Sequence, residues 1–301
     1  VVGNVLSFTY SGNPNSAKNA GSYTTTVALA TSLPSSNYVL YTGAGNKNSL
    51  SWVIAQRVVQ VSWAGDTSGA TWVDLSGVLT TTYDALSHNI EATFVNKVTG
   101  DTLTPTYSGD RNITNAGVYS TTLSSLEGAS SANYTLTGAS GLTKSWEIEK
   151  RTATIGWSAT TPVFTYNGDL QGLTVTLGNV ISADVLVFEV TTTTNSDTIT
   201  GTIVSGGSIV YSDPVFSITS TSGNTTTVAT LKAKQYGTYQ VTGIVLSGTP
   251  SSNYDLSGQS STNSFTIGKR QITLNWTSSS PYIYRYGTEQ GSSLQVSGIY
   301  P

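Results

Sequence analysis

The stretch SWEIEKRTATIGW at residues 145–157 recurs twice more in the chain, as SWVIAQRVVQVSW at 51–63 and SFTIGKRQITLNW at 264–276. Apolar and polar residues alternate in it with a period of two, which is typical of β-strands. The step from the basic residue to the final tryptophan is the same in all copies. The repetition of this long pattern indicates tandem structural units.

The alternation changes phase at the basic residue. Trp146 and Ile148 share one face of the first run, whereas Ala153, Ile155 and Trp157 share the opposite parity. No glycine, proline or serine separates these runs, so we expect the last strand of one unit to lead directly into the first strand of the next. The phase change predicts either cores on opposite sides of the shared strand or a bulge at the basic pair.

Two tyrosines precede each copy of the stretch and are always 15 residues apart. The first tyrosine lies two residues after a glycine, in AGSY, NAGVY and YGTY. The second directly follows an asparagine, in SSNYVL, SANYTL and SSNYDL. We interpret these tyrosines and the final tryptophans as core residues, with the tyrosine hydroxyls bonded to nearby backbone as in a tyrosine corner. The predicted core residues are Tyr23, Tyr38, Trp63, Tyr119, Tyr134, Trp157, Tyr239, Tyr254 and Trp276.

The repeats set the predicted domain boundaries. We expect a partial repeat at 1–56, complete repeats at 57–150 and 151–269, and a second partial repeat at 270–301. The favoured interpretation is a segment of a longer array. The alternative is a fibre in which 270–301 of one copy completes 1–56 of another.

Composition restricts the class of protein. Of 301 residues only 10% are charged and the net charge is -3, which gives no basic patch for nucleic acid. The absence of cysteine excludes disulfides and thiolate metal sites. No apolar run reaches the 18 or so residues of a membrane span. With 37% hydrophobic residues and no helical periodicity, we predict tandem all-β domains of β-sandwich or β-grasp type, arranged end to end as a rod.

The motifs FTYNG (164–168), TTYDA (81–85) and YRYG (284–287) begin a series that continues with AGxY, NYxL and the strand with its basic pair. In the order and spacing of these motifs the chain resembles the YDG and MBG type repeats of large bacterial cell-surface proteins. This resemblance implies a structural stalk or fibre segment of an extracellular, adhesin-like protein. It implies no catalytic residues and no cofactor. The partners we expect are neighbouring repeats, further copies in a homopolymer, or a host or matrix glycan or protein.

The chain offers little for catalysis or metal binding. His88 is the only histidine and lies four residues after Asp84, and we expect an exposed or half-buried strand histidine rather than part of a triad. Asp66, Asp74 and Asp84 could bind calcium only if folding brought them together. We therefore predict no enzyme, no cofactor and no metal site. Calcium binding and Lys–Asn crosslinks stay open as alternatives.

Ligand binding is the alternative function. Trp72 and the run from Tyr282 to Tyr286 could stack on sugars, although alternating aromatics more often pack inward. Repeat 151–269 also carries an insertion between Leu173 and Tyr236 that we expect to form additional β-hairpins. Such loops on a repeated scaffold are where a glycan- or protein-binding adhesin module would acquire its specificity.

Overall fold

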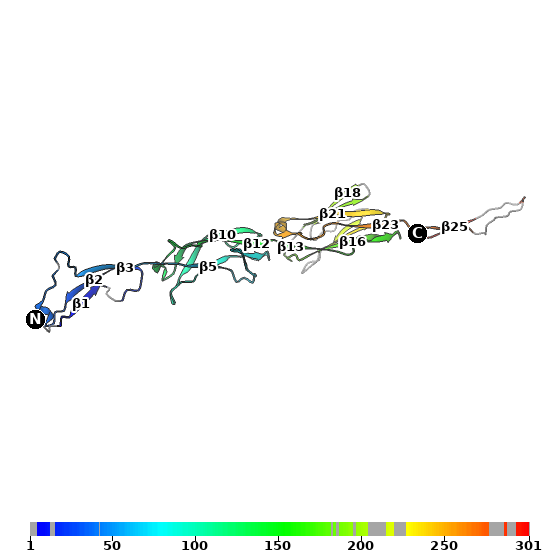
Figure 1. Ribbon diagram of the computed structural model, residues 1–301. Helices are drawn as coiled ribbons and strands as arrows, with labels where there is room; N and C mark the ends of the chain where they lie inside the picture. Colours follow the sequence, from blue (N-terminus) through cyan, green and yellow to red (C-terminus); the bar gives the residue numbers. More distant parts are fainter. Residues whose placement is uncertain are drawn as a thin grey trace. The chain divides into compact units, whose positions relative to one another are not determined.

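The computed structural model describes residues 5–12, 16–41, 43–181, 183–184, 187–194, 197–203, 215–219, 227–276, 286–287 and 293–300. The described chain is all-β, with three short 3-10 helices as its only helical segments (Figure 1). It divides into two compact units. Unit 1 is Val1–Thr80, Ser87–Ile113 and Val118–Glu147, and unit 2 is Thr81–Leu86, Thr114–Gly117 and Ile148–Pro301.

Unit 1 begins with an antiparallel sheet of β1 (Phe8–Gly12), β2 (Gly21–Leu29) and β3 (Ser49–Ile54). A five-stranded sheet has the order β6 (Val73–Leu75), β7 (Val78–Thr82), β12 (Thr143–Glu149), β10 (Gly117–Glu127) and β9 (Thr104–Gly109). Strand β5 (Val61–Gly65) pairs antiparallel with β8 (Ile90–Phe94). The short strand β4 (Arg57–Val58) pairs parallel with β11 (Tyr134–Thr135).

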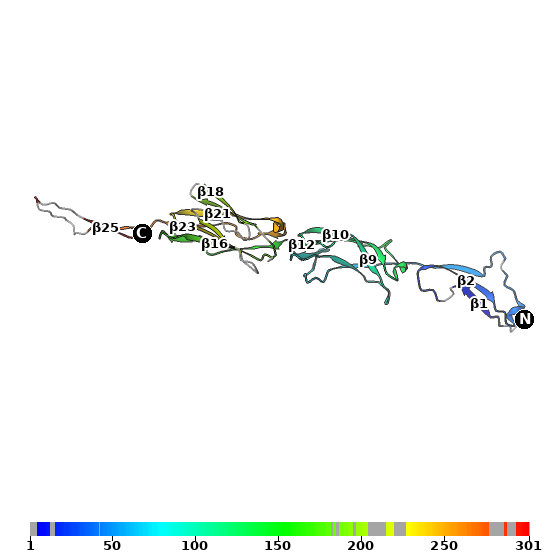
Figure 2. The same ribbon diagram turned by 180° about the vertical axis from the view of Figure 1, so that it is seen from behind.

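Unit 2 contains two larger sheets, whose strands β16, β21 and β23 can be followed in Figure 2. The first has the order β14 (Thr154–Trp157), β16 (Gln171–Gly178), β20 (Thr227–Ala233) and β19 (Val215–Thr219). The second has the order β15 (Val163–Thr165), β23 (Asn263–Gly268), β21 (Gly237–Ser247), β17 (Val187–Thr194) and β18 (Asp197–Ile203). Two small pairs complete it, β13 (Arg151–Thr152) with β22 (Tyr254–Asp255) and β24 (Thr273–Trp276) with β25 (Leu294–Ser297).

The insertion of repeat 151–269 contributes to both sheets of unit 2. Its described parts form β17 and β18, which pair antiparallel, and β19 and β20, which also pair antiparallel. The predicted run at 282–286 lies outside the described residues except for Tyr286. Among the described residues no helix is long and apolar enough to cross a membrane.

The phase change of the sequence is visible in the burial of the strands. In β12, Trp146 and Ile148 are buried, and after the basic pair Ala153 is buried while Ile155 and Trp157 are half-buried. Strands β12, β13 and β14 follow one another with single-residue gaps, as expected from the lack of a spacer. The same succession of β3, β4 and β5 occurs in unit 1, with two residues in each gap.

Each core contains an aromatic pair formed by the repeated motifs. In each pair, the first repeated tyrosine, on β2, β10 or β21, packs on the aromatic residue of the neighbouring strand, which is β3, β12 or β23 respectively. The ring centroids are 4.8 Å apart for Tyr23–Trp52, 5.0 Å for Tyr119–Trp146 and 4.9 Å for Tyr239–Phe265. The buried aliphatic side chains include Leu79, Ile90, Ala92 and Leu123 in unit 1, and Leu173, Val175, Leu231, Val241 and Ile267 in unit 2.

A glycine allows the close approach of β9 to β10. Gly109 has a φ of 90°, and a Cβ there would lie 2.4 Å from the carbonyl oxygen of Ser120. Gly12 repeats this geometry between β1 and β2, where a Cβ would lie 2.0 Å from the carbonyl oxygen of Thr24. The TYSG sequence shared by β1 and β9 therefore requires its glycine for both backbone conformation and space.

Candidate functional site at the repeated junctions

The asparagine before the second tyrosine bonds to the preceding repeat. Each of η1 (Ser35–Asn37), η2 (Ser131–Asn133) and η3 (Thr249–Asn253) ends at this asparagine. In unit 1 the Asn133 Oδ1 accepts a hydrogen bond from the Ala20 backbone N–H at 2.8 Å, and its Nδ2 donates to the Asn19 Oδ1 at 3.2 Å. One side chain thus binds both residues that precede Gly21.

The same contacts recur in unit 2. The Asn253 Oδ1 accepts from the Ala116 N–H at 2.8 Å, and its Nδ2 donates to the Asn115 Oδ1 at 3.2 Å. Asn253 is only 2% exposed, so these bonds satisfy a buried amide. The sequence repeat NAG therefore has a structural partner, the asparagine of the following repeat's NYxL motif.

The second tyrosine binds an aspartate and a backbone amide of its own repeat. The Tyr134 hydroxyl donates to the Asp101 carboxylate at 2.6 Å and accepts from the Val98 N–H at 2.8 Å. The Tyr254 hydroxyl donates to the Asp184 carboxylate at 2.6 Å and accepts from the Ile181 N–H at 2.9 Å. The two tyrosines are buried. Their bonds anchor the turn after β8 in unit 1 and the turn after β16 in unit 2.

Two further asparagines hold the arginine at the start of each complete repeat. The Arg151 guanidinium donates to the Asn179 Oδ1 at 2.9 Å, and the Asn179 Nδ2 donates to the Thr152 carbonyl at 2.7 Å. In unit 1 the Arg57 guanidinium donates to the Asn96 carbonyl at 3.2 Å, and the Asn96 Nδ2 donates to the Val58 carbonyl at 2.8 Å. These bonds fix the short parallel pairs β4–β11 and β13–β22.

The junction contacts of unit 2 include one further side chain, that of Tyr83. Its hydroxyl donates to the Asp184 carboxylate, at 3.0 Å from Oδ2 and 3.2 Å from Oδ1, so Asp184 accepts bonds from two tyrosines. The Tyr83 ring meets the Tyr254 ring edge-on with centroids 5.6 Å apart. The Tyr83 backbone N–H donates to the Glu149 carbonyl, and its carbonyl accepts from Arg151. The TTYDA motif thereby completes the junction.

The tyrosines of the junctions are held in their neutral form. Burial raises the pKa of the Tyr254 phenol well above its ordinary value, and the hydrogen bond to Asp184 raises it further. Burial, followed by Asp184, also raises the pKa of Tyr83. In unit 1 burial and then Asp101 raise the pKa of Tyr134. Protonated phenols are the form that donates a hydrogen bond to a carboxylate, as these tyrosines do.

The other predicted core residues lie at different depths. Tyr239 is buried, Tyr23 and Tyr119 are half-buried, and the hydroxyls of Tyr23 and Tyr239 donate to carbonyls four residues upstream, those of Asn19 and Gln235. Trp63 and Trp157 are half-buried, and their indole nitrogens donate to the carbonyls of Gly141 and Ser260. Tyr38 is 41% exposed and Trp276 is 57% exposed.

The Trp72 side chain is half-buried in unit 1. It covers Gly65, where a Cβ would lie 2.1 Å from the ring, and packs on His88 and Trp146 with centroids 5.8 and 6.0 Å apart. Its indole N–H is buried without a hydrogen-bond partner among the described residues. The ring is half-buried, and the predicted ligand contact stays a prediction.

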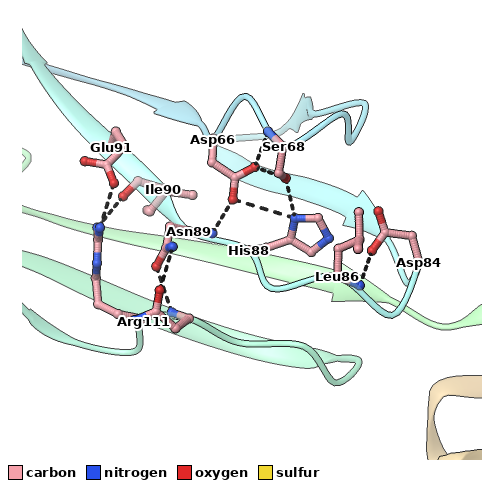
Figure 3. A network of polar contacts seen from close by, with 10 residues as sticks. Asp66, Ser68, Asp84, Leu86, His88, Asn89, Ile90, Glu91 and Arg111 are labelled. Carbon is pink, nitrogen blue, oxygen red and sulfur yellow. Dashed lines mark hydrogen bonds and ion pairs between the residues drawn. The ribbon is translucent and has the colours of Figure 1, made fainter.

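His88 is fully buried, and the expectation of an exposed or half-buried histidine is wrong. Figure 3 shows the polar contacts around it. Its Nδ1 lies 3.3 Å from the Ser68 Oγ and 3.7 Å from the Asp66 Oδ2, and Ser68 also bonds to Asp66. A nucleophilic triad needs the acid on one ring nitrogen and the serine on the other. Here both approach the same nitrogen, and the Asp84 carboxylate instead accepts from the Leu86 N–H.

The three aspartates considered for calcium have separate partners. Asp66 accepts from Ser68 and the Asn89 N–H, whereas Asp74 accepts from the Gly77 N–H and pairs with Lys144. Burial would raise the pKa of Asp66, but these hydrogen bonds and the nearby His88 outweigh it and lower the pKa. In the part of the chain that the structure describes, no three His, Cys, Asp or Glu residues form a group able to hold a metal.

Sequence reasoning missed the junction's Asn96, Asn179, Asp101 and Asp184. A signal exists, because asparagine and aspartate are five residues apart in both NKVTGD (96–101) and NVISAD (179–184). The residues between them differ, which hides the correspondence. A comparison with protein-family models found no match, and neither did a comparison with curated proteins.

Proposed function

We propose that this chain is a structural segment, a stalk or fibre piece of an extracellular bacterial surface protein built from tandem β-sandwich or β-grasp-like repeats. The proposal assigns it no enzymatic activity and no cofactor. The observation that carries it is the recurrence of one set of junction contacts in both units. Asn133 and Asn253 make the same two bonds, and Tyr134 and Tyr254 make the same bonds to Asp101 and Asp184.

Repeated junction contacts suit a mechanical role for two reasons. Hydrogen bonds between consecutive repeats resist bending, and at Asn253, which is buried, a broken bond would leave a polar group unsatisfied. The strands on either side of each basic residue follow one another closely, so there is little chain to act as a flexible linker. The bacterial surface location rests on the resemblance to YDG and MBG type repeats and on the thiol-free, weakly charged composition.

Small-angle X-ray scattering of the whole chain tests this function. We expect an elongated particle for the parent, and greater flexibility for a variant with both Asn133→Ala and Asn253→Ala. In NMR hydrogen exchange the amides of Ala20 and Ala116 should lose their protection in the same variant, because their acceptors are removed. Thr122→Ala is the matched control, since this half-buried side chain is no part of a junction.

A compact, globular scattering profile for the parent would overturn the proposal. So would a parent whose pieces move independently, or a double variant as stiff as the parent. Circular dichroism establishes that the variants keep their β-structure, so a change in scattering can be assigned to the junctions.

Glycan binding is the second candidate, and one cavity in unit 2 favours it. The cavity has a volume of about 550 Å³ and is lined by Trp157 together with uncharged hydroxyl and amide side chains, among them Thr161, Gln240 and Asn263. Aromatic rings and neutral hydrogen-bonding groups are suited to sugars. Binding on a glycan array that is lost in Trp157→Ala but kept in Trp63→Ala would favour an adhesin module, and no binding would remove this candidate.

A further inference from the structure

The two complete repeats differ in the sheet that begins after the basic residue. Residues 57–150 are all described, and in them this sheet has two strands, β5 and β8. In unit 2 the corresponding sheet continues from β14 and β16 to β20 and β19. Strand β8 therefore has an edge that carries no further strand, at the place where β16 pairs with β20.

The repeated tryptophans align β8 with β16. Trp63 lies opposite Ala92 in the pairing of β5 with β8, and Trp157 lies opposite Val175 in the pairing of β14 with β16. Ala92 therefore corresponds to Val175. On its other side Val175 lies opposite Ala229 of β20. The backbone of Ala92 thus lies where a further strand is bound in unit 2.

Alternate residues of β8 direct their backbone groups to opposite sides of the strand. The Val95 N–H donates to the carbonyl of Gln60, which directly precedes β5. In an antiparallel ladder the neighbouring residues direct their N–H and C=O groups the other way, and the pattern repeats with a period of two. The residues whose backbone groups are directed to the outer edge are therefore Ile90, Ala92 and Phe94.

Two side chains from the other sheet of unit 1 cover this edge. The hydroxyl of Tyr107, on β9, accepts a hydrogen bond from the Ala92 N–H at 2.8 Å. The guanidinium of Arg111, two residues after β9, donates to the Ile90 carbonyl at 2.8 Å (Figure 3). The guanidinium also lies over the Tyr107 ring, 4.2 Å from its centroid. Side chains therefore occupy the place that β20 has in unit 2.

Glu91 binds both of these side chains. Its carboxylate accepts from the Tyr107 hydroxyl at 2.8 Å and from the Arg111 guanidinium at 2.6 Å. Burial and the bond to Glu91 raise the pKa of Tyr107 to about 12, so at neutral pH the hydroxyl keeps the proton that it donates. We call Tyr107, Arg111 and Glu91 the edge plug.

The edge plug excludes a further strand. An uncovered strand edge is a template on which another strand can pair. A strand paired with β8 would lie about 4.8 Å from it. Tyr107 and Arg111 already lie at hydrogen-bond distance from the backbone of this edge, so a pairing strand would have to displace both.

The edge of β8 is complementary to itself. In an antiparallel pairing of two copies centred on Ala92, the two Ala92 residues face each other and Ile90 faces Phe94. All three residues direct their backbone groups outwards, so each bond is reciprocated. Ile90 and Ala92 are buried and Phe94 is half-buried, so the pairing would also join the apolar faces of the two strands. Such a two-fold contact closes at a dimer.

We propose that the edge plug prevents β8 from pairing with β8 of a second copy. Only 10% of the residues are charged, so charge repulsion does little to keep copies apart. The plug allows copies to lie side by side without joining through their sheets. This inference concerns the edge of one repeat and goes beyond the proposed function, which rests on the junctions.

Sedimentation velocity of the whole chain over a range of concentrations tests the proposal. We expect a variant with both Tyr107→Phe and Arg111→Ala to form dimers and to associate at least about tenfold more tightly than the parent. The reason is that the incoming strand no longer has to break a hydrogen bond from a charged group. Tyr107→Phe keeps the ring, which packs near Trp63 with centroids 6.0 Å apart.

Lys144→Ala is the matched control. It removes the same charge as Arg111→Ala and also breaks an ion pair, that of Lys144 with Asp74 at 3.3 Å. Lys144 lies on β12, in the other sheet, and makes no part of the plug. This variant should associate like the parent.

Hydrogen exchange identifies the surface. In the parent the Ala92 amide should be protected at every concentration by its bond to Tyr107. In the double variant this amide should exchange faster at low concentration, and its protection should return as the concentration rises and the strands pair. The Val95 amide bonds on the side of β5 and should stay protected in both proteins, which reports that β8 keeps its place.

A double variant that associates no more than the parent would overturn the proposal. Equal association of Lys144→Ala would also overturn it, by assigning the effect to charge. So would dimers in which the Ala92 amide stays unprotected, because they would form through another surface. If the double variant loses the protection of Val95, the single variants decide: each should associate more than the parent, and no change in either would overturn the proposal.

Discussion

At the scale of single residues, a carboxylate that accepts two phenols organises the junction of unit 2. Asp184 receives the hydroxyls of Tyr83 and Tyr254, which are both buried. Ionising either phenol would place a second negative charge beside the carboxylate in a site of low polarity, which is costly. The folded state therefore holds these protons more tightly than the unfolded chain does.

This arrangement predicts an alkaline transition. The pKa of Tyr83 and of Tyr254 is raised from 10.0 in the folded protein, so their contribution to stability is complete below about pH 10 and is lost as pH rises through the folded-state values. We expect the free energy of unfolding to fall above about pH 10, and to fall less steeply in Tyr254→Phe. Denaturant melts from pH 8 to 12 measure this. Equal slopes for parent and variant would contradict it.

At the scale of strands, each core is built on the contact between two neighbouring strands of one sheet. Tyr119 of β10 packs on Trp146 of β12, and the Trp146 indole donates to the Thr121 hydroxyl at 3.0 Å. The corresponding tryptophan of β3, Trp52, donates to Thr25 at 3.2 Å. In β23 the aromatic residue is Phe265, which has no N–H, and Val241 replaces the threonine. The tryptophan and the threonine therefore occur together in β2–β3 and in β10–β12, and both are replaced in β21–β23.

Trp146→Ala should therefore be among the most destabilising substitutions in unit 1. The side chain is fully buried, so its removal leaves a cavity and takes away the indole N–H that the Thr121 hydroxyl accepts, at a cost of about 3–5 kcal/mol. Trp157→Ala removes a half-buried ring and should cost less. Urea denaturation measures both, with Val53→Ala as a control because Val53 is 68% exposed on β3. A midpoint for Trp146→Ala equal to that of the control would contradict a core role.

The strands were predictable from sequence to a greater extent than the junctions. Alternation alone places Trp146 and Ile148 on one face and Ala153 on the other, because strand geometry has a fixed period of two. His88 was misjudged because its burial depends on Trp72 and Asp66, which are distant in the sequence and join it only in the fold. Asn96 and Asn179 were missed for a similar reason, since a turn asparagine has no periodic signal.

The depth of the repeated tyrosines shows another limit of sequence patterns. Tyr134 and Tyr254 begin short parallel strands and are buried, whereas Tyr38 lies outside the strands of unit 1 and is 41% exposed. All three share the NYxL motif, so the local sequence is the same. Burial follows from pairing with β4 or β13, which is a tertiary contact that local sequence does not specify.

At the scale of the whole molecule, the low charge content implies that neutral contacts hold the fold. Only 10% of the residues are charged, and the contacts of Asn133 and Asn253 involve amides and backbone. Dissolved salt screens exposed ion pairs but has little effect on buried hydrogen bonds. We expect the thermal midpoint to be the same at about 0.05 and about 0.5 M sodium chloride. The Arg111 guanidinium lies 2.6 Å from the Glu91 carboxylate. A marked fall of the midpoint at high salt, measured by calorimetry, would show that such ion pairs contribute more.

The first two copies of the motif series each carry an Asn-Ala pair, and the asparagine before the second tyrosine of the following copy bonds to that pair. A gene that gains or loses one copy of this kind by recombination therefore encodes a protein in which each of these asparagines still meets an Asn-Ala pair. Length can vary between lineages without any compensating substitution.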